Sequence, residues 1–193
     1  MKPKSTRQFV ALVSSITAFA SASLHAATYQ WNGNAIGNDS NWATDSNWTG
    51  TAPNDTNATG SHRLNVNGTA ALIHTADQGT TVFANASDRS IVIGSGSSGT
   101  MNITGGSFSS LGSKSQDIIG NGDSSTGVLN ISAGAYIGTA AGTSMGLGGG
   151  PGRVSTLTLS GSGIATVSSL QINTATANIN LNGGTRETTS IGH

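Results

Sequence analysis

The sequence predicts an all-β protein built as a β-solenoid, and three observations support this prediction. A sequence motif recurs along the second half of the chain. The first apolar residue of the alternating segment in each copy is Met101, Leu129, Leu157 and Ile179, at intervals of 28, 28 and 22 residues. Within each copy apolar and polar residues alternate, which is the two-residue period of a β-strand. One or two glycines then mark a corner. Strand-rich repeats of this length are typical of a solenoid in which each coil stacks on the next.

Each coil is predicted to contribute another inward-facing apolar residue after its corner. Seven positions after the first apolar residue, this is Phe108, Tyr136 and Ile164 in the first three copies. In the fourth copy Arg186 stands there, so that coil is either frayed or a cap. A fainter, earlier copy is Leu64–Ala71. One coil buries too little apolar surface to offset the entropy lost on ordering it, so stacking must stabilise the fold.

Asparagines recur in the middle of the alternating segments, at Asn102, Asn130 and Asn180. Stacking would place them at equivalent points on successive coils, where they either face solvent or form a ladder of side-chain amides. We favour the solvated exterior.

The spacing G-x-G-x-x-G at Gly94, Gly96 and Gly99 is also the fingerprint of a dinucleotide-binding turn. That turn requires a helix directly after the last glycine, because the helix N-terminus holds the pyrophosphate. In the following segment Gly105, Gly106 and Gly112 interrupt any helical pattern and Ser and Thr fill the gaps, so we expect no helix there. The acidic residue expected about 20 positions later is also misplaced, since Asp117 precedes the apolar pair Ile118-Ile119. We therefore interpret the glycines as a coil corner and expect no nucleotide cofactor.

Composition narrows the function classes. Gly, Ser, Thr and Asn make up 98 of the 193 residues, as expected for strands joined by many turns. Charged residues are only 8% of the chain, which argues against both a disordered polyelectrolyte and a nucleic-acid-binding surface. Cysteine is absent, so neither disulfides nor thiolate metal sites can form.

Residues 1–26 are predicted to be a signal peptide. A basic segment, Met1–Arg7, precedes an apolar segment at residues 9–22 that is too short and too rich in serine to span a bilayer. Cleavage is expected after Ala26, with Ala22 as the alternative site. The alternative interpretation of the whole leader segment is an N-terminal membrane anchor. Removal of this leader gives five basic and eight acidic side chains, a net charge of −3. We expect an exported protein, located outside the cell, on its surface or in the periplasm, with no nucleic-acid partner and no integral membrane segment after leader removal.

Residues 27–60 are predicted to form an N-terminal cap ahead of the solenoid repeats at 61–193. This segment contains all three tryptophans, Trp31, Trp42 and Trp48. One interpretation is that their rings plug the open end of the solenoid, which otherwise exposes core side chains and unpaired strand edges. The other is that they form a stacking platform for sugar rings. We favour the plug.

The sequence resembles the autotransporter-associated β-strand repeat proteins in three features. These are the opening pattern W-x-G, W, N-W, A-P, the corner turns I-G-x-G, and the segments Leu159–Ile164 and Leu181–Thr185. These proteins are numerous among exported proteins of Gram-negative and related bacteria. The resemblance covers nearly all of the chain after the leader. It implies a right-handed parallel β-helix that serves as a passenger or surface stalk, with no catalytic residues common to the family. The sequence shows neither a C-terminal membrane barrel nor a Pro-Glu-Pro type sorting tail, so the resemblance does not supply an anchoring mechanism.

An enzymatic alternative would need clustered carboxylates, because polysaccharide lyases and hydrolases on β-helices use them for metal binding or acid–base catalysis. The candidates are Asp88, Asp117 and Asp123, with Lys114 and Arg89 beside them. One carboxylate per coil is also what solvated turns provide, so we expect no catalytic site.

Metal binding is not expected either. His62 and His74 are twelve residues apart and lack the H-E-x-x-H pattern. Asp123 lies in a turn that faintly resembles calcium-binding glycine-aspartate repeats. The corresponding turns of the other copies carry Ser97 and Pro151 at this position, whereas a ladder of calcium sites needs an acidic residue in every coil.

The segment Leu181–His193 stops partway through what earlier copies show as a longer coil. We expect a coil left open in this way to expose apolar side chains and unpaired backbone groups, and therefore to self-associate. The chain is interpreted as part of a longer repeat protein or the product of a shortened gene.

The function expected from the whole sequence is an exported, non-catalytic, adhesive or structural envelope protein whose partners are surface glycans or other envelope proteins. The alternative is a carbohydrate-binding or polysaccharide-cleaving β-helix.

Overall fold

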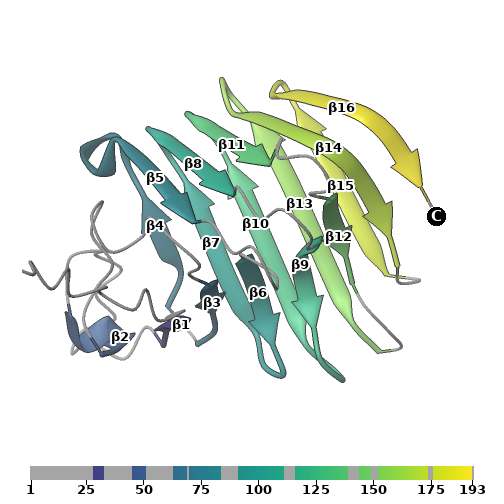
Figure 1. Cartoon of the computed structure of the whole chain (residues 1–193). Coiled ribbons are helices and arrows are strands. Elements are labelled where there is room, and N and C mark those ends of the chain that lie inside the picture. Colours follow the sequence, from purple (N-terminus) through teal and green to yellow (C-terminus); the bar gives the residue numbers. More distant parts are fainter. Residues whose placement is uncertain are drawn as a thin grey trace, which may run out of the picture.

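The computed structural model describes residues 28–32, 45–50, 63–68, 70–83, 91–110, 116–138, 144–148, 152–173 and 176–192. These residues form a β-solenoid of stacked parallel coils, which confirms the predicted fold class (Figure 1). The predicted signal peptide lies outside the described residues, as do Trp42, His62, Asp88, Arg89 and Lys114.

Each coil places one strand on each of three faces. The strands of the first face are β1 (Thr28–Trp31), β3 (Arg63–Val66), β6 (Ile91–Ser95), β9 (Gln116–Asn121) and β12 (Ser144–Leu147). Those of the second face are β4 (Leu72–His74), β7 (Gly99–Ile103), β10 (Thr126–Ile131), β13 (Val154–Ser160) and β15 (Ala177–Asn182). Those of the third face are β5 (Thr80–Phe83), β8 (Ser107–Ser110) and β11 (Ala135–Gly138). The long strands β14 (Ile164–Ile172) and β16 (Thr185–Gly192) continue from the third face into the first.

The pairing register confirms the alignment of the repeats. Met101 of β7 pairs with Leu129 of β10, which pairs with Leu157 of β13, which in turn pairs with Ile179 of β15. Because strands in a parallel sheet keep paired residues on the same side, these side chains form one inward row. The alternating burial of β13, in which every second residue is buried, shows this two-residue period directly.

The last interval is 22 residues instead of 28 because connections are lost between the strands. β14 passes through Ser168 from the third face to the first without a separate loop. Four residues join β14 to β15, whereas six join β12 to β13.

Two of the predicted positions are wrong. The row of Phe108 and Tyr136 continues through Ala165, which is 1% exposed, and not through Ile164, which is 39% exposed. Four residues separate Leu159 from Ile164, whereas three separate the paired positions Ile131 and Ala135 in the preceding coil, so the inward position follows Leu157 by eight residues and not by seven. Leu64 is also not a copy of the Met101 position, because it pairs with Ile91 on the first face; the second-face equivalent is Leu72.

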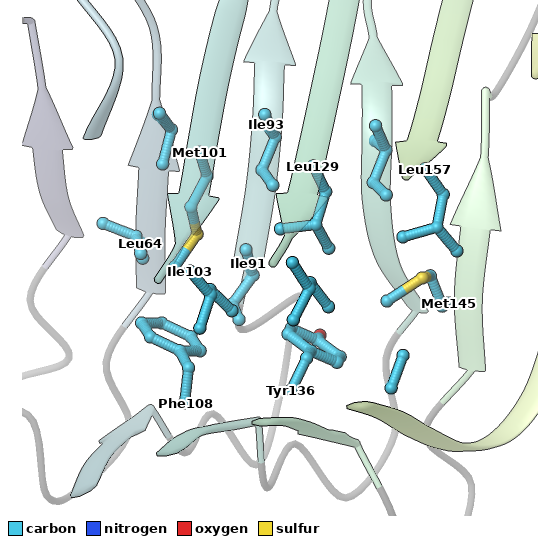
Figure 2. Packing of buried hydrophobic residues seen from close by; sticks show 14 of the residues in the cluster. Leu64, Ile91, Ile93, Met101, Ile103, Phe108, Leu129, Tyr136, Met145 and Leu157 are labelled. Atoms are coloured by element: carbon cyan, nitrogen blue, oxygen red, sulfur yellow. The ribbon is translucent and has the colours of Figure 1, made fainter. Parts of the chain in front are cut away.

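The core is formed by apolar rows that run along the solenoid axis. Figure 2 shows these side chains pointing into the space between the strands, with Phe108 and Tyr136 side by side. The rings of Phe83, Phe108 and Tyr136 stack along the third face, with centroid separations of 5.6 and 6.2 Å and interplanar angles of 16° and 9°. Phe108 and Tyr136 occupy paired positions on successive coils, whereas Phe108 pairs with Thr81 and the ring of Phe83 comes from two residues farther along β5. Stacked aromatic rings therefore fill the interior along this face.

The N-terminal end of this core is covered. β1 pairs in parallel with β3, and the short strand β2 (Trp48–Thr49), which follows the 3-10 helix η1 (Asp45–Asn47), pairs antiparallel with β1. A second 3-10 helix, η2 (Ala76–Gln78), connects β4 to β5 and begins with a capping box at Thr75.

Candidate functional site

The fold separates the two described carboxylates that were candidates for a catalytic cluster. Asp117 lies in β9 and is only 3% exposed, within the core. Asp123 lies at the corner between β9 and β10, is exposed, and forms a surface ion pair with Arg153 at 3.5 Å. The Arg153 Nε–H also donates to the Gly122 carbonyl at 2.9 Å, so the pair joins neighbouring corners.

Asp117 instead belongs to a buried hydrogen-bond cluster. The Tyr136 hydroxyl donates to Asp117 Oδ2 at 2.6 Å, and the Ile91 backbone N–H donates to Asp117 Oδ1 at 3.0 Å. These bonds compensate for removing a carboxylate from water. Burial first, and then the adjacent Asp117 carboxylate, raises the pKa of Tyr136 well above its usual value. The cluster joins two coils and two faces of the solenoid, so Asp117 has a structural role.

His74 is likewise engaged within the core. Its ring is fully buried and lies edge-to-face against Phe108 at 5.7 Å. Because the Gly105 carbonyl can only accept, His74 Nδ1 donates to it at 2.9 Å, and Nε2 is hydrogen-bonded with the Thr81 hydroxyl at 3.1 Å. Both ring nitrogens are therefore occupied. Within the described ranges, no group of three or more His, Asp or Glu side chains is placed to hold a metal ion.

Two of the three tryptophans proposed as sugar contacts are buried at the N-terminal end. Trp31 is 0% exposed and Trp48 is 5% exposed, and their rings meet edge-to-face at 5.2 Å and 77°. The Trp31 indole N–H donates to the Ala70 carbonyl at 3.0 Å. Covered rings of this kind present no free face for a sugar to stack on, so the arrangement favours the plug. Trp42 lies outside the described residues.

The glycine-rich segment forms a corner between β6 and β7, with a strand and not a helix after its last glycine. Gly94 and Gly96 have φ values of +74° and +71°, a region that favours glycine. A Cβ atom on Gly99 would collide with the Val66 carbonyl of the preceding coil. Backbone turning and close coil stacking therefore explain the spacing of these glycines.

The outer surface of the second face carries two regular rows of mostly polar residues. Asn102, Asn130, Thr158 and Asn180 pair in one row, and Thr100, Val128, Thr156 and Asn178 pair in the next. The strands β7, β10, β13 and β15 contain no charged residue. This face therefore offers hydroxyl and amide groups at the spacing of adjacent strands, about 4.8 Å.

Side-chain hydrogen bonds link the Asn row. Asn130 Nδ2–H donates to Asn102 Oδ1 at 2.9 Å, and Asn180 Nδ2–H donates to the Thr158 hydroxyl at 3.4 Å. Asn102 and Asn130 are half-buried. The expectation of a simple solvated exterior is therefore wrong for this pair, because outward-facing amides on adjacent strands lie close enough to form a ladder.

The described part of the chain contains no helix with the length and apolar character needed to cross a bilayer. No family model matches the sequence, and neither curated proteins nor solved structures give a significant match.

Proposed function

We propose that this chain is an exported, non-catalytic β-helical protein of the cell surface or envelope, with an adhesive or structural role as a passenger or stalk. The observation that carries the proposal is the placement of the described carboxylates. Asp117 is held inside the core by Tyr136, and Asp123 is paired with Arg153 on a corner. A polysaccharide-cleaving site would gather such groups on one accessible strand face.

The proposal also draws on the resemblance to autotransporter-associated β-strand repeat proteins. The solenoid fold agrees with the architecture that the resemblance implies. Its partners would be surface glycans or other envelope proteins. Export would depend on cleavage of residues 1–26, with Ala27 as the first residue of the mature protein.

The test has two parts in a bacterium that expresses the chain. N-terminal mass spectrometry of the exported protein should identify Ala27 as its first residue; exported protein with an intact Met1 would contradict the leader assignment. Surface labelling should then detect the protein on intact cells, and removal of its gene should reduce attachment or weaken the envelope. Unchanged attachment and envelope strength, with the protein confined to the cytoplasm, would contradict the proposed role.

A second candidate function, carbohydrate binding without cleavage, is favoured by the second face. Its uncharged rows of Asn and Thr match the hydrogen-bonding groups of a neutral glycan chain. Replacement of Thr156 and Thr158 by Asp should weaken binding to a neutral polysaccharide in a pull-down, because charges would require desolvation. The control is Asp77→Asn, which changes an exposed charge in η2, in the connection between β4 and β5 and outside the rows of Thr156 and Thr158. Equal binding by both variants would remove this candidate.

A further inference from the structure

We propose that Ser110, Asp117 and Tyr136 enclose a binding site for one internal water molecule, which links two successive coils of the solenoid. In this arrangement the water accepts a hydrogen bond from the Ser110 hydroxyl and donates one to the Tyr136 oxygen. The inference rests on the described core and does not depend on the adhesive or structural role proposed above.

Ser110 is a buried polar residue whose side chain has no partner within the protein. It is the last residue of β8 and is 0% exposed. Among the described residues, Ser110 Oγ is the one buried side-chain nitrogen or oxygen atom without a hydrogen-bond partner. An unpaired buried hydroxyl is unfavourable, and most buried polar groups are satisfied by the protein or by an ordered water. We therefore expect a polar ligand at this point of the core.

The side chains next to Ser110 along the solenoid axis leave room for such a ligand. Ser110 pairs with Phe83 of the preceding coil. On the following coil, the register places Gly138 at the same level, and Gly138 pairs with Val167. Two successive coils thus carry a serine and a glycine where the flanking coils carry a phenyl ring and an isopropyl group. Because protein interiors are close-packed, the smaller side-chain volume in these two coils favours a bound small molecule.

The polar partners of the water lie at the same corner of the coil. Ser110 and Tyr136 come from neighbouring strands of the third face, β8 and β11, and Asp117 lies in β9, the strand that follows β8 in the chain. Figure 2 shows the Tyr136 side chain pointing into the core. Its hydroxyl donates to Asp117 Oδ2 at 2.6 Å, so the phenol oxygen can still accept a hydrogen bond.

The Ser110 hydroxyl acts on this phenol without bonding to it directly. Burial and the Asp117 carboxylate raise the pKa of Tyr136 well above its usual value, whereas the Ser110 side chain lowers it. The two hydroxyls are therefore neighbours, yet no direct hydrogen bond of ordinary geometry joins them. A water that bridges two polar groups satisfies both at little cost in this situation.

Water suits these partners better than a cation does. Both Asp117 oxygens accept hydrogen bonds, one from the Tyr136 hydroxyl and one from the Ile91 backbone N–H. Calcium takes about six to eight oxygen ligands and magnesium about six, more than two hydroxyls and this carboxylate supply. A buried water needs only about two to four polar partners, and it can donate as well as accept. The chemistry of the site therefore selects water.

The first experiment counts long-lived internal water molecules in the purified protein, expressed from its complete sequence, by oxygen-17 magnetic relaxation dispersion. Ser110→Ala should hold one fewer than the unchanged protein, because the variant removes the hydroxyl that donates to the water. The matched control is Ser109→Ala, which deletes the same atom from the adjacent residue. Alternation along β8 places Ser109 on the outer side of the strand, so its variant should keep the full count.

The second experiment tests the bridge to the phenol by denaturant unfolding. Tyr136→Phe removes the oxygen that accepts from the water, so the water should be lost from this variant as well. Ser110→Ala should therefore shift the unfolding midpoint by less than half as much in the Tyr136→Phe background as in the unchanged protein, since both changes act through one water.

Equal counts of internal water in the unchanged protein and Ser110→Ala would overturn the proposal. So would an equal loss in Ser109→Ala, or additive midpoint shifts for Ser110→Ala and Tyr136→Phe. The unfolding midpoint should also stay the same when choline replaces sodium and potassium at constant ionic strength. A lower midpoint in choline that Ser110→Ala abolishes would show that the site holds a cation and not water.

Discussion

The Tyr136 hydroxyl donates a 2.6 Å hydrogen bond to Asp117 Oδ2 inside the solenoid, between residues on different faces. The carboxylate lies in β9, on the first face, and the phenol in β11, on the third. The bond therefore ties two walls of one coil together across the core. A buried carboxylate that is held in this way also penalises any alternative stacking that would separate it from its donors.

Tyr136→Phe should lower the free energy of unfolding by roughly 1.5–3 kcal/mol, because the variant removes a hydrogen bond to a buried carboxylate without changing the ring. Denaturant unfolding followed by circular dichroism measures the change. The double variant with Asp117→Asn should lose less than the sum of the two single variants, since both disrupt the same bond. Strict additivity would show that the bond does not stabilise the fold.

Stability should fall in alkaline solution. The pKa of Tyr136 is raised in the folded protein, so below about pH 10 both folded and unfolded states keep the phenol protonated and its contribution to stability is complete. As the pH rises above about 10, the unfolded state ionises first, and the free energy of unfolding decreases until the folded-state pKa is reached. Tyr136→Phe should show a shallower alkaline decrease; Tyr29, whose pKa burial also raises, accounts for part of what remains. An identical alkaline slope in the variant would contradict the assignment.

Gly94 and Gly96 form a matched pair for testing why the corner is rich in glycine. Both have positive φ, so either alanine variant should lose about 1–2 kcal/mol through backbone strain. A Cβ on Gly94 would lie 2.5 Å from the Thr126 carbonyl oxygen of the next coil, whereas a Cβ on Gly96 would meet nothing within 4 Å. Gly94→Ala should therefore cost roughly 1–3 kcal/mol more than Gly96→Ala, measured as midpoints of denaturant unfolding. Equal losses would mean that coil spacing adjusts freely at this corner.

Trp31→Ala should destabilise the protein by about 3–5 kcal/mol, because it opens a cavity at the N-terminal end of the core and removes the hydrogen bond to the Ala70 carbonyl. Thermal unfolding measures the loss. Ile164→Ala is the comparison, since Ile164 is 39% exposed and its truncation should cost only about 1 kcal/mol. A small effect of Trp31→Ala would mean that the plug does not stabilise the solenoid.

The sequence by itself determined the repeating part of this protein. The two-residue alternation and the constant interval from Met101 to Leu129 to Leu157 are local properties of the chain, and parallel stacking can satisfy them in only one register without exposing the core. The glycine corners could be predicted for the same reason, because a chain that must turn at a fixed interval places glycine there. The proposed plug followed from the concentration of tryptophan ahead of the repeats.

Only the tertiary structure decided where these patterns are broken. The exchange of Ile164 for Ala165 in the core row depends on one extra residue between Leu159 and Ile164, and the alternation within a strand does not show how many residues separate it from the next strand. Continuation of β14 through Ser168 is similarly a property of the stacked coils. The two-residue period does place Asp117 on the same side as Ile119, which was a signal for burial. Its partner Tyr136 is 19 residues away, and only the folding of the coil brings the phenol and the carboxylate together, which is why the sequence left Asp117 as a candidate for catalysis.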